Sequence, residues 1–600
     1  MRKKIVALVG ASALALLSMT GCSSSDDGEG TQEMKLVRCS TIMAEQKAGA
    51  DDAAAQGDAA EEQAAPAEDQ AAPAEDQAAP DAAENDVATE EQGVIYAYGI
   101  EPQTTLYPAM TNEVGGGNVV ELIFEGLTRY DVEGNTELAT AESITTEDGG
   151  KTWNIKIKEG KKFSDGSPVT AASFVDAWNV GSIPQNAMLS SYFFSPIEGT
   201  TDDGTLEEGA QCMAGLDIVS DTEFTVTLKA ADPEFDKQLG YSAFYPMPDS
   251  AFESLDALKA QGEKPVSNGS YMLANWEHDK KIELVPNPYY DGILPAKNGG
   301  VTFKMYVDDA AAYNDLLAGN LDVIDSIPAA KIATFKQDLG ERAIDQDGAV
   351  WQSFTIPYYA DHFGYDDEGR LRRQAISMAF DRQEICDTIF EGTRAPATDF
   401  VADTIPGHSD NIEGNEVLQY NPEKAKELWA QANEISDWGD TKFMIAYNAD
   451  SSAHKEWVEA VVAKISQTLD IEAEPEAYST FDQLRDDATN KAIKSALRTG
   501  WQADYPSAYN FMAPLYATGA GSNDADYANK EFDKVVNDAR NQTDEVARMA
   551  GYDQAQAILM KDLPAIPLWG QKTLGGYSEN VTDVVFNWKT VPVYQNIVRK

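Results

Sequence analysis

An acidic repeat rich in alanine and proline divides this chain of 600 residues into two parts of different character. From Glu45 to Gln92 nearly every residue is Ala, Glu, Asp, Gln or Pro, and QAAPAEDQAAPAEDQAAP repeats every seven residues. Ala and Pro occupy positions where a coiled coil needs Leu or Ile, which disfavours a zipper. Such a segment buries too little apolar surface to fold, so it predicts a solvated, disordered tether over residues 23–93. Within it, MKLVRCSTIM (Met34 to Met43) is more apolar and basic than its surroundings, and nothing in the sequence explains this.

The first 22 residues have the layout of a signal peptide. A basic cluster at residues 2–4 precedes an apolar run from Ile5 to Leu17, which is too short to span a bilayer comfortably. The run closes on Met19-Thr20-Gly21-Cys22, which resembles a bacterial lipoprotein signal in which Cys22 is lipidated after cleavage. We therefore expect a lipid-anchored protein on the outer face of the cell membrane. Ordinary secretion and an uncleaved anchor are the alternatives.

The charge of the chain excludes some classes of partner. With 100 acidic and 46 basic residues the formal net charge is -54, whereas a nucleic-acid-binding protein needs a face rich in Lys and Arg. Of the other cysteines, Cys39 falls in the tether. Cys212 and Cys386 could pair in an oxidising compartment, although their spacing does not decide this. The four histidines lack metal-site spacing, so we expect neither a metal site nor a cofactor.

After residue 93, patterns typical of strands alternate with patterns typical of helices. KTWNIKIKEG places Trp153, Ile155 and Ile157 on one face of a strand, and a helix with Thr170 as its N-cap follows. VTFKMYVDDAAAYNDLLAGNLDVID predicts a strand, a helix that stops at Gly319, and a second strand. LRRQAISMAFDRQEICDTIF predicts one long helix. The fold class is therefore mixed α/β, in more than one lobe.

Five stretches, taken in this order, resemble the family 5 solute-binding proteins of ABC importers, which include dipeptide and oligopeptide receptors. They are LIFEGLTRYDVEGN, DGGKTWNIKIKEGKKFSDGSPVTAASFVDAW, SNGSYML with LVPNPYYDG, RRQAISMAFDRQEI, and TGWQADYPSAYNF with LPAIPLW. The resemblance implies two lobes that close on a ligand like a flytrap, joined by two crossings of the chain, with an extra domain inserted in the first lobe. It places lobe I at residues 94–123, 230–350 and 566–600, the inserted domain at 124–229, and lobe II at 351–565.

The stretch RTGWQADYPSAYNF carries the candidate ligand-binding residues. Arg498 and Asp504 are six residues apart, up to about 20 Å on an extended strand, so direct pairing is difficult. A peptide offers the complementary groups, because its ammonium needs a carboxylate and its carboxylate binds a guanidinium bidentately. In the peptide receptors that this chain resembles, the aspartate that corresponds to Asp504 binds the ligand's ammonium. The arginine that corresponds to Arg498 binds the carboxylate of short peptides. Trp501 and Tyr505 either flank the pocket or belong to the core.

Two further residues are implied by the resemblance. His454 lies close to a position that reaches the ligand's C-terminal end in some oligopeptide receptors. Asn112, in TNEVGGGN, stands where some receptors carry an acidic residue, with Glu113 beside it. The glycines of that segment either allow a close approach of the backbone to the ligand or form a plain flexible loop.

The leading hypothesis is a monomeric receptor that captures peptides and delivers them to an ABC permease. The chain has no phosphate-binding loop of the Gly-rich Lys-Ser/Thr type, so the energy must come from a partner ATPase. Relatives that take nickel chelates, haem or oligosaccharides offer an alternative ligand, and a sensor or adhesin with the same fold is another. A secreted hydrolase is disfavoured because no serine elbow, His-Glu-x-x-His or Cys/His signature is present.

Overall fold

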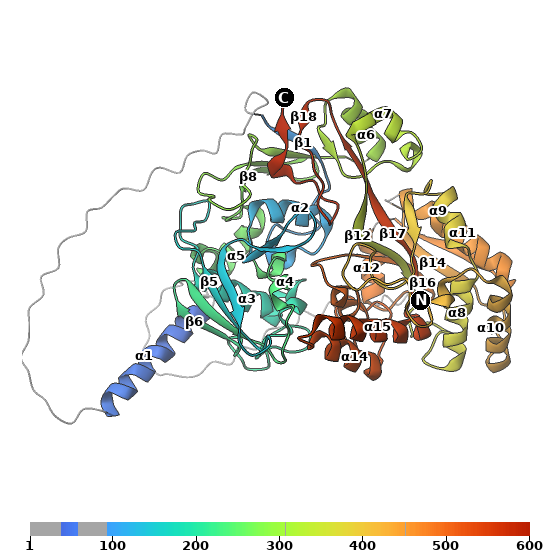
Figure 1. The fold of residues 1–600 in the computed structure, drawn as a ribbon, viewed down its shortest axis with the longest axis horizontal. Helices are drawn as coiled ribbons and strands as arrows, with labels where there is room; N and C mark the ends of the chain where they lie inside the picture. Colours follow the sequence, from blue (N-terminus) through green and yellow to red (C-terminus); the bar gives the residue numbers. More distant parts are fainter. Residues whose placement is uncertain (1–37, 58–92, 307, 450–451, 480) are drawn as a thin grey trace, which may run out of the picture.

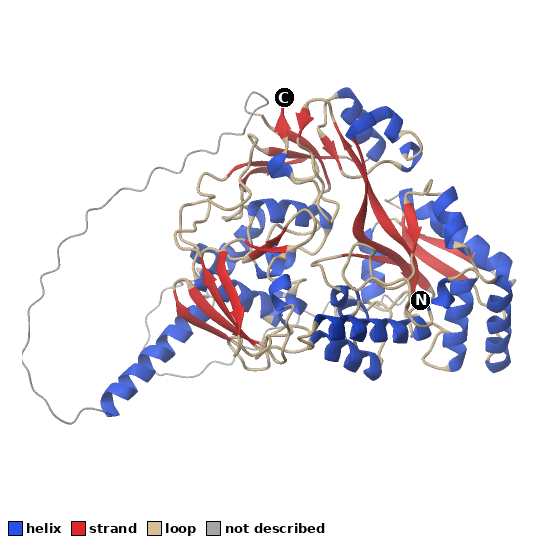
Figure 2. Cartoon of the chain, viewed as in Figure 1, coloured by secondary structure: helices blue, strands red, loops and turns tan. Residues whose placement is uncertain are grey.

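The computed structural model describes residues 38–57, 93–306, 308–449, 452–479 and 481–600. Cys22 and most of the acidic repeat lie outside these residues. Two α/β bodies are joined by a pair of long strands (Figure 1). Figure 2 shows that helices lie on the outer side of the strands in the right-hand body. No helix in the described segments is long and apolar enough to cross a membrane.

One sheet runs through both lobes. Its strand order is β15-β14-β16-β12-β17-β11-β1-β10-β9-β8, with β13 paired to β17. The strands are β1 (Ile95–Gly99), β8 (Tyr271–Glu277), β9 (Lys281–Pro286), β10 (Val301–Met305), β11 (Val323–Ile324), β12 (Ala343–Thr355), β13 (Arg394–Pro396), β14 (Phe443–Asn448), β15 (Ala473–Tyr478), β16 (Ala496–Gln502) and β17 (Ala565–Tyr577).

The two predicted crossings are the strands β12 and β17. Each has 13 residues, and they pair antiparallel along their whole length. A register shift between Asp347 and Val350 bends the ladder midway, as a β-bulge does. Val350 is the last residue of the predicted lobe I segment 230–350, and it pairs with Gln571 of β17. The point on β17 opposite Val350 therefore lies five residues after residue 566, where the last predicted lobe I segment begins.

Each lobe has its own hydrophobic core. One cluster surrounds Trp351, Trp457 and Trp569 in lobe II, and another joins Ile95, Phe303 and the inserted domain. The helices of lobe II are α8 (Asp367–Met378), α9 (Arg382–Thr388), α10 (Pro422–Ile435), α11 (Ser452–Leu469), α12 (Phe481–Thr489), α13 (Ala513–Tyr516), α14 (Lys530–Arg540) and α15 (Glu545–Asp562). The helices of lobe I are α2 (Val114–Ile123), α4 (Phe235–Gln238), α5 (Leu255–Glu263), α6 (Asp309–Ala318) and α7 (Phe335–Leu339).

The local predictions are confirmed with one exception. Gly319 ends α6 with a φ of 76°, a conformation that glycine adopts without strain. The single helix predicted over LRRQAISMAFDRQEICDTIF is wrong, because the structure splits it into α8 and α9. The cause is Asp381, whose carboxylate accepts from the amides of Gln383 and Glu384 and so caps a new helix.

The predicted inserted domain contains a separate sheet of order β4-β5-β7-β6. Its strands are β4 (Ala141–Thr146), β5 (Thr152–Ile157), β6 (Leu216–Ser220) and β7 (Glu223–Thr227); β2 (Thr128–Tyr130) and β3 (Thr136–Leu138) form a hairpin beside it. Trp153, Ile155 and Ile157 are buried on one face, as predicted. Helix α3 (Ala171–Ser182) packs on this sheet behind a capping box formed by Thr170 and Ser173.

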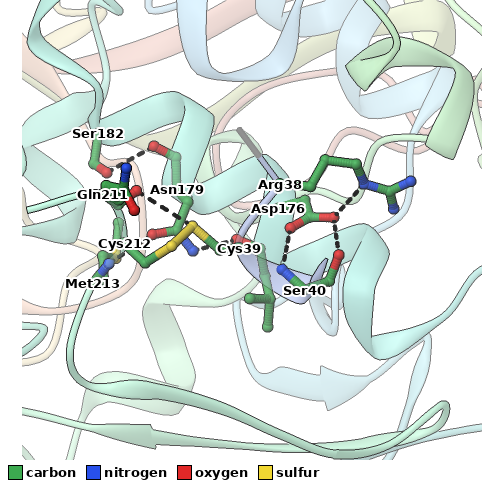
Figure 3. The surroundings of a disulfide bond; sticks show 10 residues. Arg38, Cys39, Ser40, Asp176, Asn179, Ser182, Gln211, Cys212 and Met213 are labelled. Carbon is green, nitrogen blue, oxygen red and sulfur yellow. Dashed lines mark hydrogen bonds and ion pairs between the residues drawn. A yellow bond between two sulfur atoms is a disulfide. The ribbon is translucent and has the colours of Figure 1, made fainter. Parts of the chain in front are cut away.

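One expectation about the N-terminal region is wrong, and the pairing of Cys212, which the sequence left open, is different from the one considered. Residues 39–57 form helix α1 (Cys39–Gly57), so the segment 23–93 is not a tether throughout. Cys212 pairs with Cys39 rather than with Cys386, which is buried and free (Figure 3). The described part of the apolar island, residues 38–43, therefore docks on the inserted domain, and the burial of Cys39 and Met43 accounts for its apolar residues.

Candidate ligand-binding cleft

A cleft of about 750 Å³ lies between the lobes. Lobe I contributes Asn112, Glu121, Tyr241 and Lys589, and the inserted domain contributes Tyr192. Lobe II contributes Trp351, Ser353, Phe481, Arg485, Arg498, Trp501, Asp504 and Asp524. A cavity of this size, lined by aromatic rings with a few charged groups, is typical of a small-molecule or peptide site.

The lobe II wall of the cleft is built by β12 and β16. Their antiparallel register sets Trp351 opposite Trp501 and Ser353 opposite Thr499. The hydroxyl of Thr499 lies 2.7 Å from that of Ser353 and 2.9 Å from that of Thr355. At Gly500 a Cβ atom would lie 2.9 Å from the carbonyl oxygen of Trp351, so only glycine allows this close strand approach.

Asp504 lies two residues beyond the end of β16 and is held by Asn510. The Asn510 amide donates to Asp504 Oδ2 at 2.8 Å, while its oxygen accepts from the Asp504 backbone N–H at 2.9 Å and from Trp501 Nε1 at 3.0 Å. Asn510 is fully buried. One amide therefore fixes both the carboxylate and the neighbouring indole, and we regard Asn510 as a positioning residue.

The electrostatic environment of Asp504 is unusual for an aspartate. Burial raises the pKa of Asp504 to about 6, against the hydrogen bond from Asn510 and the charge of Lys589, which both lower it. Glu121 raises it further, and Glu121 also forms an ion pair with Lys589. Burial disfavours the ionised form of such a carboxylate, and a cation that binds beside it stabilises that form.

Arg498 lies on β16 and faces the same cleft. Its Nε donates to Asn448 Oδ1 at 2.7 Å, and its guanidinium lies 4.7 Å from the centre of the Phe481 ring. These contacts hold the cation against an aromatic face, a geometry that suits guanidinium. Arg498, on β16, and Asp504, beyond the end of that strand, thus line the same cleft but contact different residues.

The other predicted site residues fall into three positions. Trp501 and the exposed Asn112 line the cleft. His454 is not among the described residues that line it, but burial and the charges of Arg498 and Arg394 lower its pKa well below the usual value. Its Nδ1 accepts from Trp457 Nε1 at 3.3 Å, so the imidazole is neutral with its proton on Nε2.

Tyr505 lies elsewhere. It is 3% exposed, packs 6.4 Å from the ring of Phe193, and lines a second cavity between the inserted domain and lobe II. The expectation that it flanks the cleft is therefore replaced by the core alternative. Glu113 has a structural role as the N-cap of α2, since its carboxylate accepts hydrogen bonds from the amides of Gly115 and Gly116.

Several residues of the cleft carry no local sequence signal. Lys589 and Glu121 come from distant parts of the chain and meet beside Asp504. Arg485 binds Asp524 bidentately across the cleft wall, with Nη1–Oδ2 at 2.6 Å and Nη2–Oδ1 at 3.0 Å. Only the position of these residues relative to Arg498 and Asp504 identifies them, and that position depends on the tertiary fold.

Next to Asp504, a buried ionic network joins the lobes. Arg540 of α14 forms an ion pair with Asp232, which is 2% exposed. Glu234, also 2% exposed, accepts from Ser507 at 2.9 Å and from Tyr552 at 3.0 Å. Since Ser507 follows Asp504 by three residues, this network fixes the loop that carries the carboxylate.

Comparison with known proteins places the fold. A family model described as "Bacterial extracellular solute-binding proteins, family 5 Middle" matches residues 135–523. The chain belongs to this family.

Individual relatives cover most of this family 5 chain. The oligopeptide-binding protein OppA of Bacillus subtilis (strain 168) is 26% identical over 499 residues, which is 80% of this chain and 88% of that protein. The periplasmic oligopeptide-binding protein OppA of Haemophilus influenzae is 27% identical over 502 residues, with coverage of 80% and 88%. The structure of the Escherichia coli murein tripeptide binding protein MppA matches with a TM-score of 0.74 at 21% identity, covering 86% of this chain and 99% of that chain. The predicted two-lobed α/β fold is confirmed.

We predict that Arg540→Ala destabilises the protein by about 3 to 5 kcal/mol, because Asp232 would remain buried without its ion-pair partner. Urea unfolding measures the change. Lys534→Ala is the matched control on the same helix, since Lys534 pairs with Asp538 at the surface and its loss should change little. Equal stability of the two variants would contradict the role of the network.

Proposed function

We propose that this family 5 protein is a receptor that binds peptides outside the cytoplasm and delivers them to an ABC permease with its ATPase. The observation that carries the proposal is the pair of opposite charges, Arg498 and Asp504, lining one cleft. Their separation along the strand, up to about 20 Å, is spanned by an extended peptide of a few residues at about 3.3 Å each. The two OppA relatives, which are named as oligopeptide-binding proteins, support the same ligand class.

In this proposal each end of the peptide has its own subsite. The ammonium binds Asp504, whose raised pKa reflects a carboxylate that gains from a cation. The carboxylate binds Arg498, with the neutral His454 near enough to this subsite for Arg498 to depress its pKa. Thr499, which lines the cleft, offers the peptide a hydroxyl whose hydrogen bond does not depend on the peptide's sequence.

The remaining parts of the proposal rest on the sequence. Cys22 carries a lipid that holds the protein at the outer face of the membrane, and the receptor acts as a monomer. It binds without catalysis and without a cofactor. Among the described residues no group of three or more His, Cys, Asp or Glu is placed to hold a metal ion.

We predict that Asp504→Asn weakens binding of a short peptide by about 2 to 5 kcal/mol, because the ligand's ammonium loses its buried partner. Isothermal titration calorimetry measures the change. The matched control is the same peptide with an acetylated N-terminus: it should bind the wild-type protein weakly and should distinguish little between wild type and Asp504→Asn. A full loss with both peptides would assign Asp504 a structural role instead.

The Arg498 subsite is tested by the complementary change. Arg498→Gln should weaken binding of peptides with a free C-terminus by about 1 to 3 kcal/mol, and amidated versions should lose less, because they bring no carboxylate. Measurement over a series of peptide lengths gives the length at which the effect is largest. Equal losses for free and amidated peptides at every length would remove Arg498 from the carboxylate subsite.

Peptide affinity should fall in acid. Asp504 has a pKa of about 6 in the empty cleft and must be ionised to pair with an ammonium, so below pH 6 binding has to displace a proton. The dissociation constant should then rise up to about tenfold per pH unit between pH 6 and pH 5, and stay nearly flat from pH 7 to 7.5. Asp504→Asn should remove this dependence, and a wild-type affinity that is unchanged from pH 7 to pH 5 would contradict it.

A further inference from the structure

The N-terminal segment is joined to the inserted domain by a disulfide and by buried polar contacts. Cys39 is 1% exposed and is joined to Cys212 across 173 residues of chain. The loop that carries Cys212 is itself fixed, because the backbone N–H of Met213 donates to Asn179 Oδ1 of α3 at 2.7 Å (Figure 3). The disulfide therefore joins two ordered parts of the structure.

A buried carboxylate on the inserted domain is satisfied by the N-terminal segment. The side chain of Asp176, on α3, is 1% exposed. It accepts from Arg38 Nε at 3.0 Å, from the Ser40 backbone N–H at 2.8 Å and from the Ser40 hydroxyl at 2.6 Å. A buried carboxylate is stabilised by such hydrogen bonds and charge pairing, so these contacts favour the docked position of residues 38–40.

Further contacts extend the docked surface on both sides of the disulfide. Arg38 Nη2 lies 2.7 Å from Asp249, and its guanidinium lies 5.8 Å from the centre of the Phe252 ring. Met43 is 9% exposed, and Lys47 lies 3.0 Å from Asp217 on β6. We name residues 38–48, with these contacts, the clasp. Helix α1 continues from the clasp away from the body, on the side of the inserted domain farthest from lobe II (Figure 1).

We propose that the clasp makes the inserted domain, rather than the start of β1, the point at which the membrane anchor holds the receptor. This inference rests on the lipid anchor proposed at Cys22. Cys22 and Val94 are 72 residues apart, which allows a reach of up to about 250 Å, whereas Cys22 and Cys39 are 17 apart, which allows at most about 60 Å. The disulfide thus shortens the maximum distance between anchor and receptor about fourfold and decides which face lies nearest the membrane.

The clasp also makes residues 58–92 dispensable for anchoring, because the covalent path from Cys22 to the body passes through the disulfide. This gives a direct test in cells. A recognition site for a sequence-specific protease, flanked by Gly and Ser, is inserted after Ala72 of the full-length protein, and intact cells are treated with the protease. Cells and medium are then assayed for the C-terminal fragment, which contains residues 73–600, with cleavage monitored on reducing gels.

The clasp predicts that cleaved wild-type protein stays with the cells and enters the medium when a reductant is added. The comparison variant, Cys39→Ser with Cys212→Ser and Arg38→Ala, should be retained before cleavage and released after it without reductant. Release of the cleaved wild-type protein without reductant, or equal retention of the variant, would overturn the proposal. Peptide affinity should be equal in both proteins, which confirms that the variant is folded.

Two readouts separate this inference from the proposals on which it rests. If the uncleaved protein is already in the medium, the lipid anchor is wrong, and the clasp is then tested on that soluble protein. Peptide mapping without reductant should yield Cys39 and Cys212 in one linked peptide, whether or not the inserted site is cleaved. Its absence overturns the clasp, while a loss of peptide binding in both proteins concerns only the cleft.

Discussion

The antiparallel pairing of β12 and β17 is the constraint on which the rest of the structure depends. These two strands are the covalent crossings between the lobes, and their ladder continues into β16 on one side and β11 on the other. Because β16 pairs with β12, the residues that line the cleft are placed relative to the hinge itself. A change in the bend of the ladder would therefore move Arg498 and Asp504 together with the wall of the cleft.

Several buried charged groups lie where the lobes meet. Asp504 is held by the amide of Asn510, with Lys589 and Glu121 close by, and the ion pair of Asp232 with Arg540 lies behind the same loop. Burial makes each of these groups costly unless it is paired. The network of Asp232 and Glu234 has ion-pair and hydrogen-bond partners within the protein. Burial raises the pKa of Asp504, so a cation bound beside it would favour its ionised form.

Local patterns predicted what depends on neighbouring residues. The strand at Trp153 and the stop at Gly319 use information within a short window of sequence, and the resemblance that singled out Arg498 and Asp504 uses the order of five such windows. The same approach missed Lys589, which is 85 residues from Asp504, and the partner of Cys212, which is 173 residues away, since long-range packing has no periodic signal. It also placed Tyr505 ambiguously, because an aromatic residue at a strand end has the same sequence pattern in a core and in a pocket.

If the two charges of the cleft select a zwitterionic peptide, the ligand carried by the purified protein reveals it most directly. Native mass spectrometry of the receptor purified from cells grown in rich medium, followed by release and sequencing of the bound molecules, identifies that ligand. We expect a heterogeneous series of intact peptides, each with a free amino and a free carboxyl end. A single non-peptide mass, or an empty cleft that added peptides fail to fill, would contradict it.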